Sequence, residues 1–504
     1  MARIAVIGAG MGAMAAAARL AVAGHRVAVY ERTETYGGAV RRFERDGFGF
    51  DTGPGLLPLP AVYRDLFIKT GKEPLEACVE LVQVDPSARH VFADGTEARL
   101  PNASRAGVVT ALDAALGAGT GGRWGDFLVR AREAWDRTRR PLLEEPLWPN
   151  WQALAEREPY PAVPHKRFLR TRRAGTLAEV GAWELRDPRL VALLESHALA
   201  YGLDPRETPA SAAVLPYLEH AFGIWYVRCG IRELARAVYE RCLARKVEFS
   251  FGAEVSGVLE KDGRAAGLEL ADGSVVEADF VVSGVAPWVL DRLVRGTAPR
   301  GEGEVAPQRG AASRLTVLLA LRGARPEDAA HRTVVHAEDR EAELDALFGT
   351  AGGMAARATV TVLRPDDPAL VPDTGHEAIT LTATVPAQPD RGGAEPENLD
   401  RHAEDLITVA ERAVPDLRDR LLWHEVRTPA DIAEETGAEG GAVPAPALAA
   451  AQGRLLHPSN STAVSGLFTV GGWSHPGGGL PHAGMSGALV AGLIVEGPEF
   501  RGSQ

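Results

Sequence analysis

The sequence predicts an α/β protein with two kinds of domain, one built on a covered parallel sheet and one of mixed α+β architecture. Three observations favour this class. The chain begins with a β-branched strand, a glycine-rich turn, an alanine-rich helix and a second strand in direct succession. Strand-like segments separated by short turns recur between residues 247 and 283, and again between residues 313 and 386. The length of 504 residues is enough for two or three domains.

The first turn has the pattern of a dinucleotide-binding loop. Residues 3–7 are predicted to form a buried strand, and Gly8, Gly10 and Ala13 after it fit G-x-G-x-x-A. In this pattern the first glycine allows a tight turn, the second admits a pyrophosphate, and the alanine keeps helix and strand close. The sequence therefore predicts a Rossmann-like domain. A structural βαβ unit that binds no nucleotide is the alternative.

The segment after this turn continues the pattern. A helix is predicted over residues 11–23, and its first amides, including Met11 and Gly12, would face the phosphate. A second strand is predicted over residues 25–30, and Glu31 follows it directly. This residue follows Gly8 by about 20 positions, the spacing of the acid that binds a ribose hydroxyl. An acid here argues against a 2′-phosphate on the adenosine.

Composition excludes several classes of protein. Lys and Arg number 55 against 67 Asp and Glu, a net charge of −12, so nucleic acid is a poor candidate partner. The three cysteines Cys78, Cys229 and Cys242 show no metal-binding spacing and predict no metal site. Neither a signal peptide nor an apolar run of about 18 residues is visible. The sequence therefore predicts a cytoplasmic protein.

Two further groups of strands are predicted. Residues 247–251, 258–259, 267–270 and 275–277 would form a β-meander inserted into the dinucleotide-binding domain, and residues 279–283 another buried strand. An antiparallel sheet is predicted from residues 313–323, 332–339, 357–363 and 377–386, with a covering helix over residues 399–414. Residues 301–312 and 387–399 are predicted to be linkers or exposed loops.

A glycine-rich segment lies near the end of the chain. Residues 471–482 read "GGWSHPGGGLPH", with an apolar run before them and the helix-forming "AGMSGALVAGLIV" after them. Glycines allow other groups to approach the backbone closely. The segment therefore predicts a loop packed against a ligand.

Several segments together resemble the bacterial-type phytoene desaturase family of FAD-dependent carotenoid desaturases, within the flavin amine oxidase superfamily. The resemblance rests on the Gly37-Gly38 turn after Glu31-Arg32, on "FDTGPG" at residues 50–55, and on the C-terminal glycine-rich segment. Residues 81–101, 186–210, 217–242 and 247–287 extend it over most of the chain.

The resemblance implies a noncovalent FAD and a set of residues that hold it. Val255 would lie at the adenine, and the alternative is that it is only a core residue. The cofactor-binding positions implied beyond the first loop and Glu31 are Arg32, Gly37, Gly38, Ala39, Arg41, Gly53, Pro54, Gly55, Gly230, Val255, Gly472, Gly478, Gly479, Leu480 and Met485.

The sequence departs from the family at two of these positions. Cys229 precedes Gly230 where relatives commonly have two glycines, and Ala39 follows Gly38 where a basic residue is frequent. Arg41 and Arg42 are candidates to replace that basic residue.

The resemblance also implies how the C-terminal segment acts. The glycines at 477–479 would lie flat along the isoalloxazine ring, and Gly484, Met485 and Ser486 would be the amides at a helix N-terminus that faces the pyrimidine edge of the flavin. Such amides and the helix dipole stabilise negative charge that develops there.

Histidines in this segment are candidate bases. His475 and His482 are of the residue type that titrates near neutrality. For His475 the alternative is a structural hydrogen bond to the backbone in a tight turn. The pocket around the ring is expected to include the candidate catalytic residues His220, Trp225, Tyr226, Trp473 and His475.

The implied domains are discontinuous. Residues 1–75, 222–300 and 455–504 are predicted to form the FAD-binding domain, and residues 76–221 and 301–454 a substrate-binding domain with a helical subdomain. Residues 141–169, rich in proline and carrying two tryptophans, predict either a lid with a peripheral membrane contact or ordinary packing against a neighbouring helix.

These expectations combine into an FAD-dependent dehydrogenase or desaturase that removes hydrogen from a long apolar isoprenoid or polyene. Hydride would pass to flavin N5, and oxygen or a quinone would reoxidise the flavin, because no second fingerprint for NAD is visible. Two alternatives stay open: a soluble tailoring dehydrogenase or isomerase for a polyketide or carrier-bound polyene, and a non-catalytic flavin-binding protein.

Overall fold

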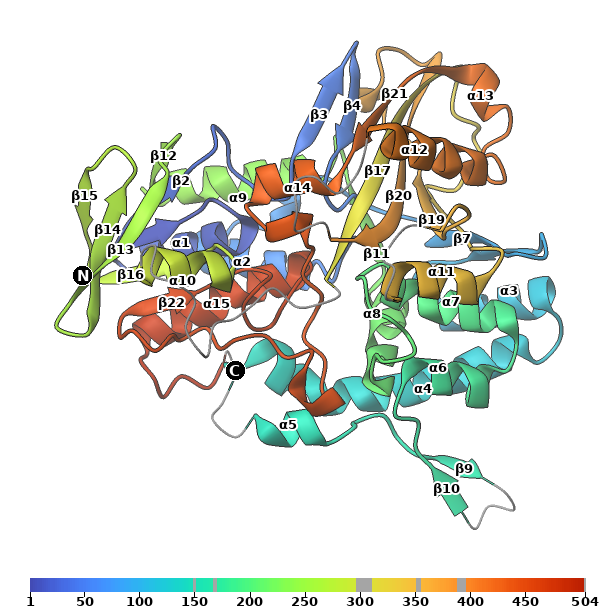
Figure 1. Cartoon of the computed structure of the whole chain (residues 1–504), viewed down its shortest axis with the longest axis horizontal. Helices are drawn as coiled ribbons and strands as arrows, with labels where there is room; N and C mark the ends of the chain where they lie inside the picture. Colours follow the sequence, from blue (N-terminus) through green and yellow to red (C-terminus); the bar gives the residue numbers. More distant parts are fainter. Residues whose placement is uncertain (148–150, 166–169, 296–310, 350–354, 388–395, 503–504) are drawn as a thin grey trace.

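The computed structural model describes residues 1–147, 151–165, 170–295, 311–349, 355–387 and 396–502. Figure 1 shows the described chain as two parts, with the N-terminal strands and the C-terminal helix in one part and most of the middle of the chain in the other. The predicted loops at residues 301–312 and 387–399 fall largely outside the described residues.

A five-stranded sheet with all strands parallel forms the core of the first part. Its order is β12-β2-β1-β16-β22, so β1 lies in the centre with β2 and β16 on either side. The strands are β1 (Arg3–Ile7), β2 (Arg26–Glu31), β12 (Glu248–Phe251), β16 (Phe280–Ser283) and β22 (Leu467–Thr469).

Each face of this sheet is covered by different elements. Alternate residues of a strand point to opposite faces. Ile4 and Val6 therefore pack with helices α1 (Met11–Val22), α9 (Arg232–Ala244) and α15 (Leu480–Val495). Ala5 and Ile7 pack with α10 (Pro287–Arg295) and the antiparallel strands β13 (Val255–Lys261), β14 (Arg264–Leu270) and β15 (Val275–Glu277). The predicted β-meander is thus confirmed for β13, β14 and β15. Residues 247–251, predicted to be its first strand, instead provide β12 at the edge of the parallel sheet.

Helices α1 and α15 pack closely because glycines lie at their contact. A Cβ on Gly12 would lie 2.9 Å from both the Ala483 carbonyl oxygen and the Gly471 Cα. A Cβ on Gly487 would lie 2.7 Å from the Gly12 carbonyl oxygen. The first helix and the last are therefore held backbone to backbone, which places the C-terminal segment beside the glycine-rich turn.

We expect Gly12→Ala to lower the free energy of unfolding by about 1–3 kcal/mol, because the new methyl group meets main-chain atoms that cannot rotate away. Urea unfolding without added FAD measures this. The control is Gly122→Ala in α4 (Thr120–Arg139), where no atom lies within 4 Å of the new Cβ and helix propensity favours alanine. Equal stability of the two variants would contradict the close packing.

The second part contains a seven-stranded sheet of order β21-β17-β20-β19-β18-β7-β8. It was predicted to be antiparallel, but β18 pairs with β7 in parallel, because β7 and β8 come from a distant segment near residue 90. The strands are β21 (Leu421–Arg427), β17 (Ala312–Arg322), β20 (His376–Pro386), β19 (Val360–Leu363), β18 (Arg332–Val335), β7 (Ala88–Val91) and β8 (Glu97–Leu100).

The two faces of this sheet carry different side chains, and one of them packs on a helix. The face with Leu315, Val317, Leu319 and Leu381 packs on helix α12 (Pro396–Ala410), which confirms the predicted covering helix. Arg314, Thr316 and Leu318 point to the opposite face, as do their cross-strand partners on β20. This second face is called the inner face below. Further helices around the sheet are α11 (Arg340–Phe348), α13 (Leu417–Arg420) and α14 (Pro429–Thr436).

Helices fill the remainder of the second part. Their bounds are α3 (Arg105–Leu116), α4, α5 (Gln152–Glu156), α6 (Leu177–Val180), α7 (Pro188–Leu199) and α8 (Val214–Phe222). A small hairpin of β9 (Val163–His165) and β10 (Arg170–Arg172) projects from them in Figure 1. Among the described residues, no helix combines the length and apolar character needed to cross a bilayer.

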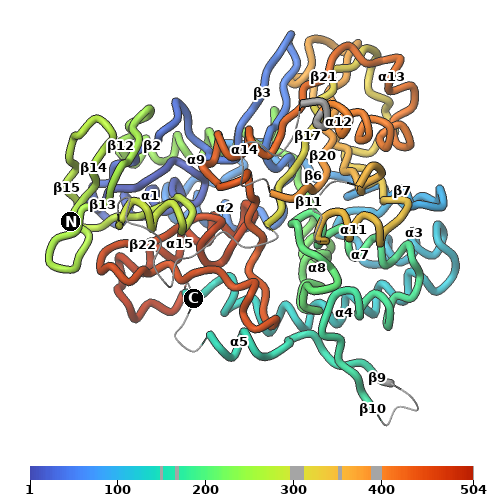
Figure 2. The backbone as a smooth tube through the Cα atoms, viewed as in Figure 1, coloured from blue at the N-terminus to red at the C-terminus, as the bar shows by residue number. Residues whose placement is uncertain are grey.

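Shorter elements connect the two parts. Strand β11 (Ile224–Val227) lies between β5 (Leu57–Pro58) and β6 (Leu81–Gln83), and helix α2 (Ala61–Gly71) follows β5. The hairpin of β3 (Arg42–Arg45) and β4 (Phe48–Asp51), which the sequence did not predict, packs Phe48 and Phe50 against the seven-stranded sheet. Figure 2 shows how the blue N-terminal chain and the red C-terminal chain run through the same region of the molecule.

Candidate dinucleotide and substrate site

The turn between β1 and α1 has room for a phosphate. Gly10 precedes the helix with φ −70° and ψ 164°, and no atom lies within 4 Å of the position a Cβ would take there. The first amides of a helix have no partner within it, so those of Met11, Gly12 and Ala13 are available to an anion. The Cβ of Ala13 lies 3.2 Å from the position a Cβ on Gly284 would take, which shows the close packing of helix and sheet expected there.

The carboxylate of Glu31 is fixed beside this turn. Glu31 ends β2 and is buried, and its Oε2 accepts the Ala9 N–H at 2.7 Å. Its Oε1 accepts the Thr33 N–H at 2.9 Å and the Thr33 hydroxyl at 2.8 Å. These bonds orient the acid at the end of the strand, where the predicted ribose contact requires it.

The Gly37-Gly38 turn lies directly against the phosphate loop. The Gly37 N–H donates to the Ala9 carbonyl at 2.8 Å, and a Cβ on Gly38 would lie 3.1 Å from Gly10 Cα. Arg41 spans this turn, because its Nε donates to Gly38 O at 2.9 Å and its Nη2 donates to Thr33 Oγ1 at 3.0 Å. Of the candidates for the missing basic residue at Ala39, the structure thus brings Arg41 to the turn.

The neighbouring arginines have other partners. Arg42 turns away, and its Nη1 donates to the Cys229 carbonyl at 3.2 Å. Arg32 donates to the carbonyl of Glu434, and nothing in the structure brings it to the phosphate loop.

Arg232 is a site residue that the sequence analysis missed. It begins α9, its guanidinium lies 4.0 Å from the centre of the Tyr36 ring, and its Nη1 donates to the carbonyls of Tyr36 and Val40. The side chain therefore holds both ends of the Gly37-Gly38 turn. Arg232 lies two residues after Gly230, and this position in the sequence is the signal that could have identified it as a site residue.

The "FDTGPG" segment packs this turn against the rest of the molecule. Asp51 accepts the Ile231 N–H at 2.9 Å and the Arg232 N–H at 3.4 Å, so it caps the start of α9. Burial raises the pKa of Asp51 to about 7. A Cβ on Gly53 would lie 2.0 Å from the Ala39 carbonyl oxygen, and one on Gly55 would lie 2.6 Å from Leu363 Cδ1. These glycines therefore serve close packing, and Pro54 lies exposed between them.

The predicted start of the C-terminal helix was wrong. Helix α15 begins at Leu480 with Gly479 as its N-cap, so Gly484, Met485 and Ser486 lie inside the helix and cannot be its terminal amides. The amides left free at this N-terminus belong to Gly479, Leu480 and His482, because Pro481 has no N–H and the Ala483 N–H already donates to the Gly479 carbonyl. Leu480 accepts the Tyr63 hydroxyl at 2.9 Å, which fixes the first turn.

The side chain of Ser486 has a structural role instead. Its Oγ accepts the Gly471 N–H at 3.0 Å and the amide of Asn460 at 3.3 Å. The serine therefore ties the helix to the start of the glycine-rich segment.

The three consecutive glycines do not all face open space. A Cβ on Gly478 would lie 1.9 Å from the Pro444 carbonyl oxygen, and one on Gly477 would lie 2.7 Å from the Ala445 carbonyl oxygen. A Cβ on Gly472 would likewise lie 2.7 Å from Pro444 Cγ. These glycines accommodate the chain near residue 445, whereas the Cβ position of Gly479 lies 3.9 Å from the hydroxyl of Tyr201.

The histidines of this segment are buried and neutral. Burial lowers the pKa of His475 and of His482 to about 4. The Nε2 of His475 lies 2.9 Å from the Glu145 carbonyl oxygen, which favours the structural alternative for this residue. Neither Nδ1 has a hydrogen-bond partner among the described residues.

The remaining candidate catalytic residues are dispersed. Trp225 and Tyr226 are successive residues of β11 and point to opposite faces, so they do not line the same pocket. Tyr226 donates to Asp367 at 2.8 Å. His220 accepts the Trp124 indole N–H at 3.2 Å, and Trp473 packs edge-on against a neighbouring tryptophan, Trp288, at 4.7 Å.

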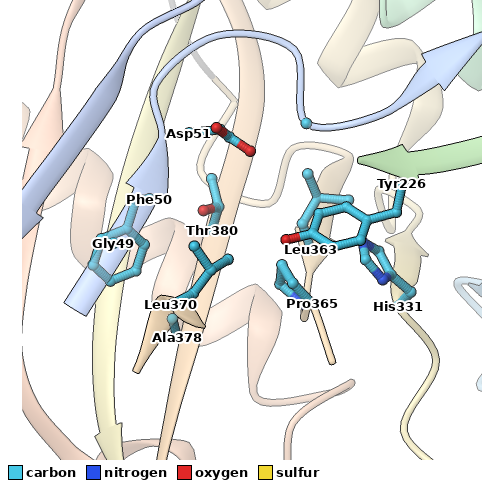
Figure 3. Close-up of a pocket in the computed structure, with 11 residues that line it drawn as sticks. Gly49, Phe50, Asp51, Tyr226, His331, Leu363, Pro365, Leu370, Ala378 and Thr380 are labelled. Carbon is cyan, nitrogen blue, oxygen red and sulfur yellow. The ribbon is translucent and has the colours of Figure 1, made fainter. Parts of the chain in front are cut away.

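Tyr226 lines a small cavity between the two parts of the molecule (Figure 3). The cavity has a volume of about 20 Å³, enough for one water and too small for a polyene. Burial lowers the pKa of His331 at its edge to about 3, and the His331 Nε2 has no partner among the described residues. The lining residues are Gly49, Phe50, Asp51, Gly55, Tyr226, His331, Leu363, Pro365, Leu370, Ala378 and Thr380.

The chain is similar to known proteins of one family. The family described as flavin containing amine oxidoreductase matches residues 14–495. The chain belongs to this family. FAD is its cofactor, and the space at Gly10, the free amides of α1 and the oriented carboxylate of Glu31 fit the diphosphate and ribose of that group.

Curated relatives extend over nearly the whole chain. The 4,4'-diapolycopene oxygenase of a Methylomonas species is 29% identical, with 98% of each chain covered. The zeta-carotene-forming phytoene desaturase of Myxococcus xanthus is 28% identical over 97% of this chain and 93% of its own. An oxidoreductase structure from Methanosarcina mazei superposes with a TM-score of 0.63 at 19% identity, covering 97% of this chain and 99% of its own. The predicted fold class, family and cofactor are confirmed, and the protein is an FAD-dependent oxidoreductase.

Val255, predicted to lie at the adenine of this flavoprotein, is a buried member of the core between β1 and the meander. Gly230 lies in a left-handed turn with φ +93° before α9, where a Cβ would meet the Asp51 carboxylate at 2.8 Å. Both positions stay predictions as FAD contacts.

Proposed function

We propose that the protein is a desaturase that removes hydrogen from adjacent carbons of a long polyene isoprenoid. When bound, FAD supplies the hydride acceptor for this reaction. The single observation that carries the proposal is the similarity, over nearly the full length of the chain, to a carotenoid desaturase and a carotenoid oxygenase. An isoprenoid desaturase needs few charged groups at the reacting carbons, in agreement with the neutral histidines near Gly479.

The residues of the chain have defined tasks in this proposal. Gly10 and the first amides of α1 would hold the diphosphate, and Glu31 would hold the ribose hydroxyls. Arg41 and Arg232 fix the Gly37-Gly38 turn over the phosphate loop. The N-terminus of α15 at Leu480 would offer its positive dipole to the flavin and so favour the negative charge that reduction produces.

The electron acceptor and the cellular location belong to the same proposal. Oxygen or a quinone would be the electron acceptor that returns the flavin to its oxidised form. Contact with a membrane surface supplies the apolar substrate, and Trp151, which is 38% exposed next to α5, is one aromatic side chain available to that contact.

Incubation of the purified FAD-loaded protein with phytoene in detergent tests the proposal. We expect products lighter by two hydrogens for each new double bond, with absorption shifted to longer wavelength, as measured by chromatography with mass detection. The Gly10→Ala protein is the control, because it lacks only the space for the diphosphate. Reaction with a polyene thioester alone would overturn the proposal in favour of a carrier-bound substrate, and reaction with neither would favour a binding protein.

A further inference from the structure

A tyrosine is held at the start of the C-terminal helix by the seven-stranded sheet. The loop after α7 is bonded to that sheet, because Thr384 Oγ1 donates to Leu199 O and Arg314 Nη2 donates to Ala200 O, both at 2.7 Å. Tyr201 follows in this loop, and its hydroxyl lies 3.9 Å from the Cβ position of Gly479. The inner face of the sheet and the glycine-rich segment therefore meet at Tyr201.

One arginine near this tyrosine is neutralised. Arg332 on β18 donates to Glu219 on α8 through two bonds, at 3.0 Å and 2.6 Å. His197 Nε2 lies 3.5 Å from the same carboxylate. Burial opposes ionisation of Glu219, but Arg332 outweighs it and holds the pKa of Glu219 well below its usual range. This pair carries no net charge to offer a ligand.

The second arginine, Arg314, has no such counter-ion. Among the described residues no carboxylate pairs with it, and the hydrogen bond that it makes goes to the neutral carbonyl of Ala200. A guanidinium stays protonated in proteins and has five N–H donors, so most of its donors are left for a ligand. Arg314 is half-buried, so its charge is partly removed from water without a counter-ion, which is costly. The position is therefore suited to an anion that the protein does not itself supply.

Half-buried polar residues extend from Arg314 along the inner face. Arg314 pairs with Thr384 across β17 and β20, and Thr382 and Thr380 follow at every second position on the same face. All four are half-buried, whereas the intervening residues of β20 are buried. From Thr384 to Thr380 the strand extends about 14 Å. Thr380 lines the cavity in Figure 3, so this row ends at the hairpin of β3 and β4.

From this arrangement we infer that the polyene substrate carries a carboxylate at one end, and that Arg314 and the Tyr201 hydroxyl bind it. The inference rests on the proposed desaturase function and adds the chemistry of the substrate terminus. The charged end of the substrate is held close to Gly479. Arg314 and Tyr201 are then specificity-determining residues and take no part in hydrogen removal.

Binding of all-trans retinoic acid and its methyl ester to the FAD-loaded protein, followed by tryptophan fluorescence quenching, tests the inference. The acid is expected to bind at least about tenfold more tightly than the ester, because a charge-assisted bond to guanidinium is lost in the ester. In Arg314→Met the ratio of the two affinities is expected to approach one. Arg314→Lys should keep part of the preference for the acid over the ester. The control is Arg322→Met, an exposed arginine at the other end of the same strand.

Equal affinity for acid and ester in the unmodified protein would overturn the inference. A shift of the flavin reduction potential in Arg314→Met without loss of the acid preference would also overturn it, because Arg314 would then act on the flavin. These results are distinguishable from failure of the proposed function. If hydrocarbon polyenes are desaturated without any acid preference, only the inference falls. If the acid preference is present but no polyene reduces the flavin, only the proposed function falls.

Discussion

Gly10→Ala is expected to give a folded protein that binds FAD at least about tenfold more weakly than the unmodified chain. The position tolerates a side chain in the protein alone, because φ is −70° and no atom lies within 4 Å of the new Cβ. The same methyl group would occupy the space in which the diphosphate approaches the amides of α1. The loss therefore falls on binding and leaves folding intact.

Titration of the apoprotein with FAD, followed by flavin fluorescence, measures this affinity, and urea unfolding without FAD measures stability. The Gly122→Ala protein is again the control, because its new methyl group also meets open space but lies on α4, far from the phosphate loop. Unchanged FAD affinity in Gly10→Ala would place the diphosphate elsewhere. A large loss of stability would instead show that Gly10 serves packing, as Gly12 does.

Acid is expected to destabilise the protein strongly between about pH 6.5 and pH 4, because buried histidines stay neutral in the folded state and become protonated on unfolding. A depressed pKa contributes stability that is complete above the unfolded value and is lost as the pH falls toward the folded value. Each such group changes the free energy of unfolding by about 1.4 kcal/mol per pH unit in this range. The histidines with a lowered pKa caused mainly by burial include His90, His220, His331, His336, His475 and His482.

Six carboxyl groups among the described residues act in the opposite direction. Burial raises the pKa of Asp51 and of Glu158 to about 7, and it also raises the pKa of Glu184, Glu195, Glu343 and Glu435, so all six favour the folded state as the pH falls. Eight described histidines have a lowered pKa and outnumber them, because burial also lowers the pKa of His25 and His457. Urea unfolding at pH 7.5, 6 and 5 should therefore give a falling free energy of unfolding.

One substitution isolates the effect of a single histidine. His475→Asn should reduce the pH dependence of the free energy of unfolding by about one proton. Stability that is constant from pH 7.5 to pH 5 would contradict neutral, buried histidines.

The dinucleotide half of the fold could be predicted because its signals are local. Strand, glycines, helix and acid follow one another within the first 31 residues, and each constrains its neighbours through backbone geometry alone. The predicted start of α15 is wrong because proline is also common in loops, where the prediction places Pro481. Proline is well tolerated in the first turn of a helix, so it marked the beginning of α15.

Long-range contacts explain the other differences. The contact of Gly477 and Gly478 with the chain near residue 445 joins segments about 30 residues apart, and no local pattern indicates it. Arg314 lies on β17 and Tyr201 in the loop after α7, and their approach depends on how the sheet packs on the helices. Trp225 and Tyr226 were assigned to one pocket although alternation along a strand separates them.

An anaerobic single-turnover measurement tests the central claim most directly. The FAD-loaded protein is mixed with phytoene in detergent without oxygen, while the visible flavin band and the products are followed together. We expect the flavin band to bleach and one new double bond to form for each flavin reduced. Formation of the double bond without flavin reduction, or an oxidised flavin that no polyene reduces, would contradict it.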